Sequence, residues 1–327
     1  MIIFYLILFI SAIGLTYLVR LLAIKKNIFD NPNERSSHTI PTPRGGGLAI
    51  VIVWFLGLGY LFWAGQIEQN LFLALLSGLV LAIVSLLDDI MDLKPTIRML
   101  AQSISAVGAL YFLGGFHILP ELNNPILFWL INIGVFIGII WFINLYNFLD
   151  GIDAYASQEA IFVAAGLLIF TGNPILGLLI VAVGGFLVWN WPKAKIFMGD
   201  VGSTQLGFIL VVLGIYFHNK IELDIFSWLV LTSIFWFDAS YTLFRRWRNK
   251  EKLSVAHKKH AYQRLIQGGF SHLKVDVLAI GLNSLLIGLV YLNKLYFSTG
   301  ILLLLIVIGL LFFVNSRVDK FFPFKND

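Results

Sequence analysis

Long apolar segments, separated by shorter polar connections, run along the whole chain. Eleven of these segments are candidates for membrane-spanning helices, which need roughly 17–25 mainly apolar residues. They are residues 2–24, 47–64, 71–87, 98–114, 126–146, 159–172, 174–190, 203–218, 225–243, 275–292 and 296–314. We therefore expect an all-α, polytopic transmembrane helical bundle of about eleven spans, forming a single domain over residues 1–327.

Basic residues are unevenly divided between the two sides of this predicted bundle. The connections after the odd-numbered segments, together with the C-terminal tail, hold twenty Lys and Arg residues, whereas the other connections hold two. Because Lys and Arg accumulate in cytoplasmic loops, we expect the N-terminus outside and the C-terminus in the cytoplasm. The predicted cytoplasmic loops are residues 25–46, 88–97, 147–158, 191–202 and 244–274. The first segment lacks a basic n-region and a small-residue cleavage site, so we expect it to remain as a span.

The composition agrees with a membrane protein. Hydrophobic residues make up 59% of the 327 residues and charged residues 13%, whereas an average soluble domain has about 25% charged residues. The sequence has no cysteine, which excludes disulfides, thiolate nucleophiles and cysteine-bound metals. The net charge of +5 is explained by the cytoplasmic loops, so we expect no nucleic-acid partner.

Two adjacent carboxylates, Asp88 and Asp89, follow the third apolar segment, and Asp92 lies three residues further on. Acids at the C-terminal end of a helix meet the unfavourable end of its dipole, and neighbouring like charges repel one another. A structural role would not favour this arrangement, so we interpret Asp88 and Asp89 as catalytic residues. The alternative is a solvated polar loop.

A second polar cluster follows the fifth segment, where Asn144, Asn147, Asp150 and Asp153 are spaced by three residues. On a helix, residues with this spacing line one face, so we interpret the four as substrate-binding residues. Gly151 would let a ligand approach the backbone closely. The alternative is an Asn- and Asp-rich helix end with ordinary capping.

The third cluster, residues 197–203, reads Phe-Met-Gly-Asp-Val-Gly-Ser and precedes an apolar segment. Backbone N–H groups at such a helix N-terminus suit a phosphate, although Ser203 could instead cap the helix. Acids are scarce in this chain, and three acid clusters fall on one predicted side of the membrane. This gathering indicates a divalent cation, because Mg²⁺ prefers carboxylate oxygens together with water and substrate phosphates.

Histidine and basic side chains from two loops complement the acids. The last long loop carries His257, His260 and Arg264, and the first carries His38 and Arg44. A His-x-x-His pair could bind a metal, but we favour contact with phosphate because the acids already suit the cation. The alternative is a juxtamembrane basic patch that holds anionic membrane lipid.

Taken together and in this order, the motifs resemble those of the polyprenyl-phosphate N-acetylhexosamine-1-phosphate transferases. The motifs are Leu87-Asp88-Asp89, Asn147-x-x-Asp150-Gly151-x-Asp153, Phe197-Met198-Gly199-Asp200-x-Gly202-Ser203 and the histidine-rich last loop. This family includes undecaprenyl-phosphate N-acetylglucosamine-1-phosphate transferases and phospho-N-acetylmuramoyl-pentapeptide transferase. Eleven spans are similar to the N-acetylglucosamine branch. The run His257-Lys-Lys-His260 departs from the consecutive histidines of the muramoyl-pentapeptide enzymes and is similar to the O-antigen branch.

The resemblance implies a bacterial inner-membrane phosphotransferase whose donor is a UDP-N-acetylhexosamine and whose acceptor is undecaprenyl phosphate. Its lipid-diphosphate-sugar product would initiate O-antigen or a related cell-envelope polysaccharide. The cofactor would be Mg²⁺, with Mn²⁺ as an alternative, held by Asp200 and Asp153, and Asp200 would also be catalytic. Asp88, beside Asp89, would act as a base or position the acceptor, and Phe197 would stack on uracil. The particular sugar, and whether the protein forms a homodimer, stay open.

The main alternative function is a secondary membrane transporter. Transporters place charged groups near the bilayer midplane on broken helices, whereas the acids here gather near the predicted ends of the spans. A non-catalytic scaffold gives no reason for three acid motifs. An enzyme that uses CDP-activated lipid headgroups would need an acid signature on a single helix. The sequence therefore favours the transferase.

Overall fold

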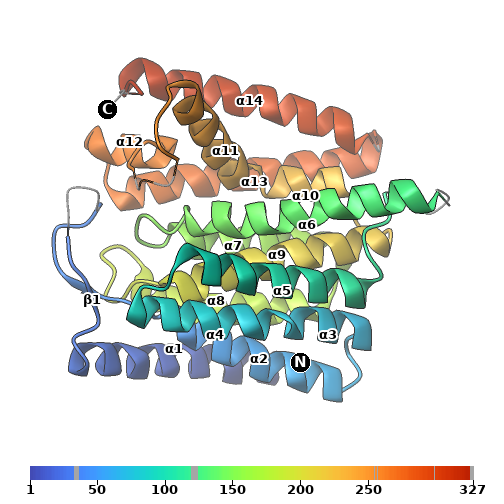
Figure 1. The fold of residues 1–327 in the computed structure, drawn as a ribbon, viewed down its shortest axis with the longest axis horizontal. Coiled ribbons are helices and arrows are strands. Elements are labelled where there is room, and N and C mark those ends of the chain that lie inside the picture. Colours follow the sequence, from blue (N-terminus) through green and yellow to red (C-terminus); the bar gives the residue numbers. More distant parts are fainter. Residues whose placement is uncertain (33–36, 119–123, 254, 256, 298, 325–327) are drawn as a thin grey trace.

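The computed structural model is a bundle of long helices that run roughly parallel or antiparallel to one another (Figure 1). It describes residues 1–32, 37–118, 124–253, 255, 257–297 and 299–324. In chain order the elements are α1 (Ile2–Lys25), β1 (Phe29–Asp30), β2 (Thr42–Pro43), α2 (Gly47–Trp63), α3 (Gln69–Leu76), α4 (Gly78–Met91), α5 (Pro95–Leu113), α6 (Pro125–Asn147), α7 (Tyr155–Thr171), α8 (Pro174–Asn190), α9 (Asp200–Asn219), α10 (Ile225–Leu231), α11 (Ser233–Arg248), α12 (Ala261–Gln267), α13 (His272–Tyr296) and α14 (Gly300–Phe321).

Each of the eleven apolar segments coincides with helix in the structure. Nine match a single helix, and two are broken: residues 71–87 at Ser77, between α3 and α4, and residues 225–243 at Thr232, between α10 and α11. Within the described residues, seven helical stretches are long and apolar enough to cross a membrane, and α2, α7 and α8 are shorter apolar helices. The chain is therefore a polytopic helical membrane protein, as its hydropathy predicts.

Short capping motifs set where several helices begin. Asn124 and Asn173 accept hydrogen bonds from the first backbone N–H groups of α6 and α8, and a proline follows each of them. Ser271 caps α13 in the same way through the N–H of Lys274. A side-chain acceptor followed by proline is a strong helix start, because it satisfies an orphan donor and fixes φ.

Helix α9 is the centre of the bundle and is buried along almost its whole length. It packs against α2, α4, α6 and α7. Its contact with α2 depends on Gly47 and Gly202, because a Cβ added to Gly47 would collide with the Gly202 backbone. This close approach fixes the N-terminal end of α9 beside the start of α2.

The polar connections of the predicted cytoplasmic side lie at one end of the bundle, on the left in Figure 1 together with β1 and α12. The two short strands pair antiparallel, with Phe29 opposite Pro43. The segment before α9 extends this pairing, since Phe197 N–H donates to Pro43 O (2.8 Å) and Gly46 N–H donates to Phe197 O (2.9 Å). Two loops that are distant in sequence are thereby joined around the start of α9.

Candidate functional site

A polar cavity of about 390 Å³ lies at this end of the bundle, and we call it the acid pocket. Segments from the whole length of the chain contribute to its wall. The lining residues are Asp30, Ser37, His38, Arg44, Asp89, Asn147, Asp150, Gly151, Ile152, Asp153, Phe197, Gly199, Asp200, Gln263 and His272. Residues from all three acid motifs and from the first loop therefore line one cavity, but Asp88, which the sequence also placed there, does not line it.

Asp89 is buried and connects the end of α4 to the start of α9. Its carboxylate accepts the backbone N–H groups of Asp200 (3.0 Å) and Val201 (3.1 Å). These are among the first donors of α9, which have no partner inside the helix. Arg44 lies beside this cap, with Nη2 3.5 Å from Asp89 Oδ1 and 2.7 Å from Asp89 O. Asp89 therefore shapes the pocket by holding the N-terminus of α9.

Gly199 is the residue that allows this cap to form. Its backbone lies at φ +77° and ψ 172°, a region that is essentially restricted to glycine. A Cβ at this position would lie 2.7 Å from Asp89 Oδ2. The glycine before the motif acid is thus required both by the backbone conformation and by the approach of the Asp89 carboxylate.

Asp88 lies next to the acid pocket but does not line it. Its Oδ1 accepts the N–H of Leu93 (2.7 Å), and its Oδ2 accepts Nη1 of Arg98 (3.1 Å). The same Arg98 nitrogen lies 3.7 Å from Asp200 Oδ2. Arg98 therefore joins two of the predicted catalytic acids. Sequence reasoning used it only as a cytoplasmic charge, because its contacts depend on the packing of α5 beside α4 and α9.

The prediction of a helical stripe through residues 144–153 is wrong beyond Asn147, where α6 ends and a series of turns begins. Asn144 points away from the pocket and exchanges hydrogen bonds with the Gln102 side chain. Asn147 lines the pocket and accepts a hydrogen bond from Ser203 Oγ (2.6 Å). The turn, rather than a helix face, brings Asp150 and Asp153 to the pocket wall.

Asp150 lies in this turn among other carboxylates. Burial raises the pKa of Asp150 well above the ordinary carboxyl value, and the negative charges of Asp200 and Asp89 raise it further. This is the behaviour expected where like charges are gathered away from water. A bound cation would relieve the repulsion.

Asp153 is held from two sides. Its Oδ2 accepts the N–H of Ala194 (3.1 Å) and lies 3.2 Å from His272 Nδ1. His272 is the first residue of α13, and its other ring nitrogen lies 3.3 Å from Ser37 O. Sequence reasoning missed His272, because it lies eight residues beyond the histidine-rich motif, which ends at Arg264.

Besides Asn144, three of the predicted binding residues, all from the last long loop, do not line the acid pocket. His260 is buried, stacks on Tyr262 and lies 3.9 Å from Asp238, and burial lowers its pKa to about 3. His257 packs on His260. Arg264 pairs with Asp319 and donates to Phe322 O. None of these three lines the acid pocket, and α12 contributes Gln263 to its wall instead. Their contact with substrate stays a prediction.

The remaining predicted residues form the outer wall of the pocket. His38 packs edge-on against Phe197, with 4.8 Å between the ring centroids, and lies 3.9 Å from Asp30. Both rings, together with Arg44, line the cavity. An aromatic ring beside cations is a suitable surface for a base and its phosphates.

The carboxylate oxygens of the acid pocket could supply part of the coordination shell of a cation, with other ligands filling the rest. Asp89, Asp150, Asp153 and Asp200 supply carboxylate oxygens, but no three acidic or histidine groups among the described residues are close enough to hold an ion alone. Mg²⁺ commonly binds through one or two carboxylates, with water and substrate phosphates completing its shell. The residues present therefore fit Mg²⁺.

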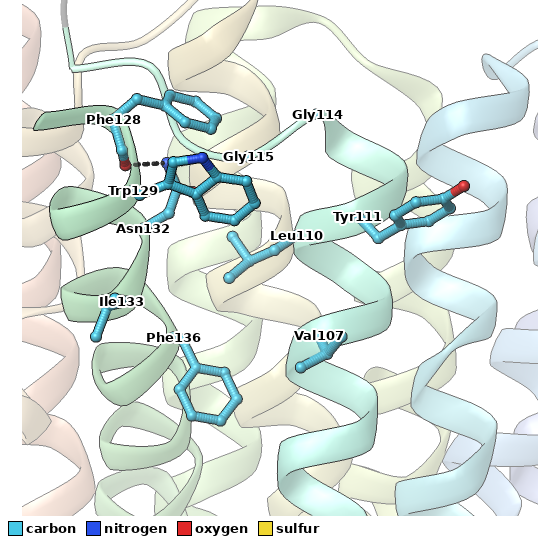
Figure 2. Close-up of a pocket in the computed structure, with 10 residues that line it drawn as sticks. All are labelled: Val107, Leu110, Tyr111, Gly114, Gly115, Phe128, Trp129, Asn132, Ile133 and Phe136. Carbon is cyan, nitrogen blue, oxygen red and sulfur yellow. Dashed lines mark hydrogen bonds between the residues drawn. The ribbon is translucent and has the colours of Figure 1, made fainter. Parts of the chain in front are cut away.

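An apolar cavity of similar size, about 410 Å³, lies between α5 and α6 at the opposite end of the bundle. Figure 2 shows Leu110, Trp129 and Phe136 among the side chains of its wall. Asn132 is its main polar side chain, and that amide donates to Phe128 O (2.9 Å) in its own helix. This cavity brings no charged group to a ligand.

Comparisons with known proteins agree with the motifs of the acid pocket. The family model described as glycosyl transferase family 4 matches residues 71–218. A probable undecaprenyl-phosphate N-acetylglucosaminyl 1-phosphate transferase of Bacillus subtilis is 29% identical over 287 residues, covering 83% of this chain and 78% of the relative. A decaprenyl-phosphate N-acetylglucosaminephosphotransferase of Mycobacterium tuberculosis is 27% identical (79% and 73% covered). A phospho-N-acetylmuramoyl-pentapeptide-transferase of Latilactobacillus sakei is 27% identical (72% and 79% covered). Residues 71–218 are thus similar to glycosyl transferase family 4, and most of the chain is similar to these transferases.

Proposed function

We propose that this protein transfers an N-acetylhexosamine 1-phosphate from a UDP-sugar to a polyprenyl phosphate, with undecaprenyl phosphate as the acceptor. The observation that carries the proposal is the acid pocket, where Asp89, Asp150, Asp153 and Asp200 meet beside Arg44. The relatives support the reaction class. Two are named as enzymes that transfer N-acetylglucosamine phosphate to a polyprenyl phosphate, and the third is named as a transferase of phospho-N-acetylmuramoyl-pentapeptide.

In this reaction an anion attacks an anion. An oxygen of the acceptor phosphate forms a bond to the β-phosphorus of the donor, and the bond from that phosphorus to the bridging oxygen breaks. UMP leaves with the bridging oxygen, and the sugar stays on the β-phosphate in the lipid diphosphate. Catalysis of such a step depends mainly on positioning and on neutralising charge. Among the described residues, the guanidinium groups of Arg98 and Arg44 lie within 4 Å of the motif acids.

The protein does not require a general base for this attack, because a phosphate monoester with a second pKa of about 6 is largely dianionic at neutral pH. Asp88 already accepts hydrogen bonds from the Leu93 N–H and from Arg98. We therefore assign Asp88 a positioning role: it orients Arg98 toward Asp200 and the acceptor.

We assign Asp200 and Asp153 as the carboxylates that would hold Mg²⁺, with Mn²⁺ as a substitute. When bound, the ion would neutralise the donor diphosphate and stabilise the leaving group. Asp89 keeps Asp200 in place through the cap of α9, and His272 holds Asp153. Asn147 and Asp150 also line the acid pocket and would contact the nucleotide.

We place the nucleotide base at Phe197. Its ring lines the acid pocket next to His38 and belongs to the segment that hydrogen-bonds to Pro43. Arg44, from the same strand end, would meet the donor phosphates. This arrangement would bind the uridine at the rim and leave the diphosphate over the acids.

We propose that all eleven apolar segments cross a bacterial inner membrane, with the N-terminus outside and the acid pocket facing the cytoplasm. The excess of Lys and Arg in the connections on the acid-pocket side supports this orientation. A cytoplasmic pocket would also have direct access to a UDP-sugar. The product would start O-antigen or a related envelope polysaccharide, as the loop His257-Lys-Lys-His260 suggests.

The test is turnover by purified protein in detergent, with no membrane gradient. A panel of UDP-N-acetylhexosamines is incubated with undecaprenyl phosphate and Mg²⁺, UMP is quantified and the lipid product is identified by mass. We expect UMP and a lipid-diphosphate-sugar in equal amounts for at least one donor. If the folded protein forms neither product with any donor, the proposal is wrong. The relatives named above are transferases, and nothing in the acid pocket favours the transporter.

A further inference from the structure

A second polar cavity, distinct from the acid pocket, lies between α12 and the end of α14. We call it the basic pocket, and its volume is about 380 Å³. Lys258, Lys259 and Arg264 line it, together with Phe321 and Phe322. No acidic residue is part of this lining within the described residues. Helix α12 separates the two sites, because Gln263 faces the acid pocket and Arg264 faces the basic pocket.

Arg264 gives the basic pocket a fixed, buried cation. The residue is 5% exposed, and its guanidinium is held by Asp319, Asn315 and the carbonyl of Phe322. Its Nε is buried and has no hydrogen-bond partner among the described residues. Buried donors are nearly always paired in native proteins, so an unpaired N–H on a residue that lines a cavity points to an acceptor outside the part of the chain that the structure describes.

The other two cations are arranged differently. Lys259 pairs with Glu251 (2.9 Å), which also binds Arg246. Lys258 is half-buried, and its carbonyl accepts a hydrogen bond from Gln267 (2.6 Å). Lys258 therefore has its backbone fixed at the pocket wall. Three cations around one cavity favour an anionic occupant, and phosphate oxygens match both Arg and Lys donors.

An apolar cavity of about 440 Å³ adjoins the basic pocket, and we call it the apolar groove. It lies among α11, α12, α13 and α14, and Phe321 and Phe322 line both cavities. Leu278 and Leu282 of α13 and Val314 of α14 form part of its wall. Its one acidic residue, Asp238, accepts the backbone N–H of Ala261. The two cavities together therefore present a cationic end and an apolar end.

The basic pocket and the apolar groove lie where a bound membrane lipid could reach both of them. Helix α13 begins at His272 and α14 ends at Phe321, and both helices are long and apolar enough to span a bilayer. The basic pocket lies where these two helices reach their polar ends, at the depth of lipid headgroups. The apolar groove extends from there along the same helices, where acyl chains would lie in a membrane.

We propose that the basic pocket and the apolar groove bind one anionic phospholipid. The headgroup phosphate accepts hydrogen bonds from Arg264, Lys258 and Lys259, and an acyl chain fills the groove. Such a lipid braces α12, whose Tyr262 hydroxyl donates to Phe148 O and whose Gln263 lines the acid pocket. The inference needs the membrane topology but not the transferase reaction.

The test measures lipid binding without turnover, so its result is independent of the proposed reaction. Full-length protein in neutral detergent is titrated with phosphatidylglycerol or with phosphatidylcholine of the same acyl chains, and bound lipid is counted by native mass spectrometry. We expect phosphatidylglycerol to bind about fivefold more tightly, as one favourable basic contact near a membrane surface allows. Equal binding of the two lipids would overturn the proposal.

Four variants locate the site. Lys258→Glu should remove the preference for phosphatidylglycerol, and Lys258→Gln should reduce it. Lys252→Glu is the matched control, because Lys252 is an exposed lysine of the same loop outside both cavities, and it should keep the preference. Leu278→Trp, at an exposed position of the groove, should weaken binding of both lipids. Unchanged selectivity in folded Lys258→Glu protein contradicts the assignment.

Two other occupants are separate outcomes of the same titration. If undecaprenyl phosphate alone binds and phosphatidylglycerol does not, the cavity belongs to the acceptor and the proposal is wrong. If a chain that stops at Phe324 gains phosphatidylglycerol binding that the full chain lacks, residues 325–327 are the occupant and the proposal is again wrong. Equal, tight binding of phosphatidylglycerol by both chains supports it.

Discussion

Two cavities at opposite ends of the bundle have almost the same volume and differ completely in their walls. The acid pocket, about 390 Å³, collects five aspartates, Arg44 and two histidines. The apolar cavity of Figure 2, about 410 Å³, is lined mainly by aliphatic and aromatic side chains. Its one asparagine, Asn132, donates a hydrogen bond to the backbone carbonyl of Phe128 in its own helix. Helix α6 contributes to both, with Asn147 at one end and Phe128 to Phe136 at the other.

The comparison teaches that the size of a cavity does not identify a site in a membrane protein. Apolar cavities between spans are filled by lipid or detergent at little cost, because the surrounding medium is equally apolar. Gathered carboxylates repel one another and lose hydration, so they are retained where a cation and a charged substrate compensate them. The following predictions contrast the two ends, from the largest expected effect to the smallest.

Replacing the pocket acid that begins α9 should have the largest effect. Asp200→Asn keeps the shape and a residue that is tolerated at a helix start, but it removes the charge that we assign to the cation. We expect UMP release to fall on the order of 10³-fold, while membrane insertion and gel-filtration behaviour stay unchanged. Full turnover by the folded variant would remove Asp200 from the reaction.

Removal of divalent cations should act on the acid pocket in the same direction. EDTA should stop UMP release, and excess Mg²⁺ or Mn²⁺ should restore it, because the carboxylates and the donor diphosphate need a shared counter-charge. The measurement is the initial rate before chelation, after chelation and after re-addition of each ion. Undiminished turnover in EDTA would contradict the cation assignment.

Removing the Arg98 side chain, which contacts both Asp88 and Asp200, should lower turnover about 100-fold. Arg98→Ala removes the cation that contacts Asp88 at 3.1 Å and Asp200 at 3.7 Å, so the acceptor phosphate would meet uncompensated acids. Arg98→Lys should recover part of the rate. Lys94→Ala is the matched control, since Lys94 is an exposed cation of the same connection, and its rate should stay near wild type.

Gly199→Ala tests whether the geometry of the acid pocket, rather than its charge alone, is required. The new Cβ would meet Asp89 Oδ2 at 2.7 Å in a backbone region restricted to glycine, a strain of about 1–3 kcal/mol. We expect a drop in turnover of roughly tenfold and a lower melting temperature. Gly281→Ala in α13, where no atom lies within 4 Å of the added Cβ, should change neither.

Much of this fold could be predicted from hydropathy, because a bilayer requires long apolar helices and no other element. The eleven segments found in this way all became helix. The breaks at Ser77 and Thr232 could not be predicted, since both lie in continuous apolar runs. Helix α12 was also missed, because a seven-residue polar helix has too little periodicity to detect.

The acids of the site could be predicted because their charge is rare in this chain and their local motifs are distinctive. Arg98, His272 and Gln263 could not, since tertiary packing alone brings Arg98 to Asp200 and places His272 and Gln263 in the wall of the acid pocket. The turn after Asn147 was misjudged for a related reason. Spacing by three residues suits a helix face, and only the packing of Tyr262 against Gly151 and Phe148 O specifies a turn here.

The smallest effect is expected at the apolar cavity of Figure 2. Trp129 lines this cavity and is 66% exposed, so Trp129→Ala removes a contact with the surrounding apolar medium and opens no interior void. We expect UMP release per folded protein to stay within about twofold of wild type, because surface substitutions of this kind change stability by only about 0.5 kcal/mol. A tenfold loss in the folded variant, measured at saturating undecaprenyl phosphate and again at low concentration, would contradict the contrast between the two ends. A loss confined to low acceptor concentration would further show that the far cavity holds part of the acceptor chain, and the two cavities would then belong to one substrate path.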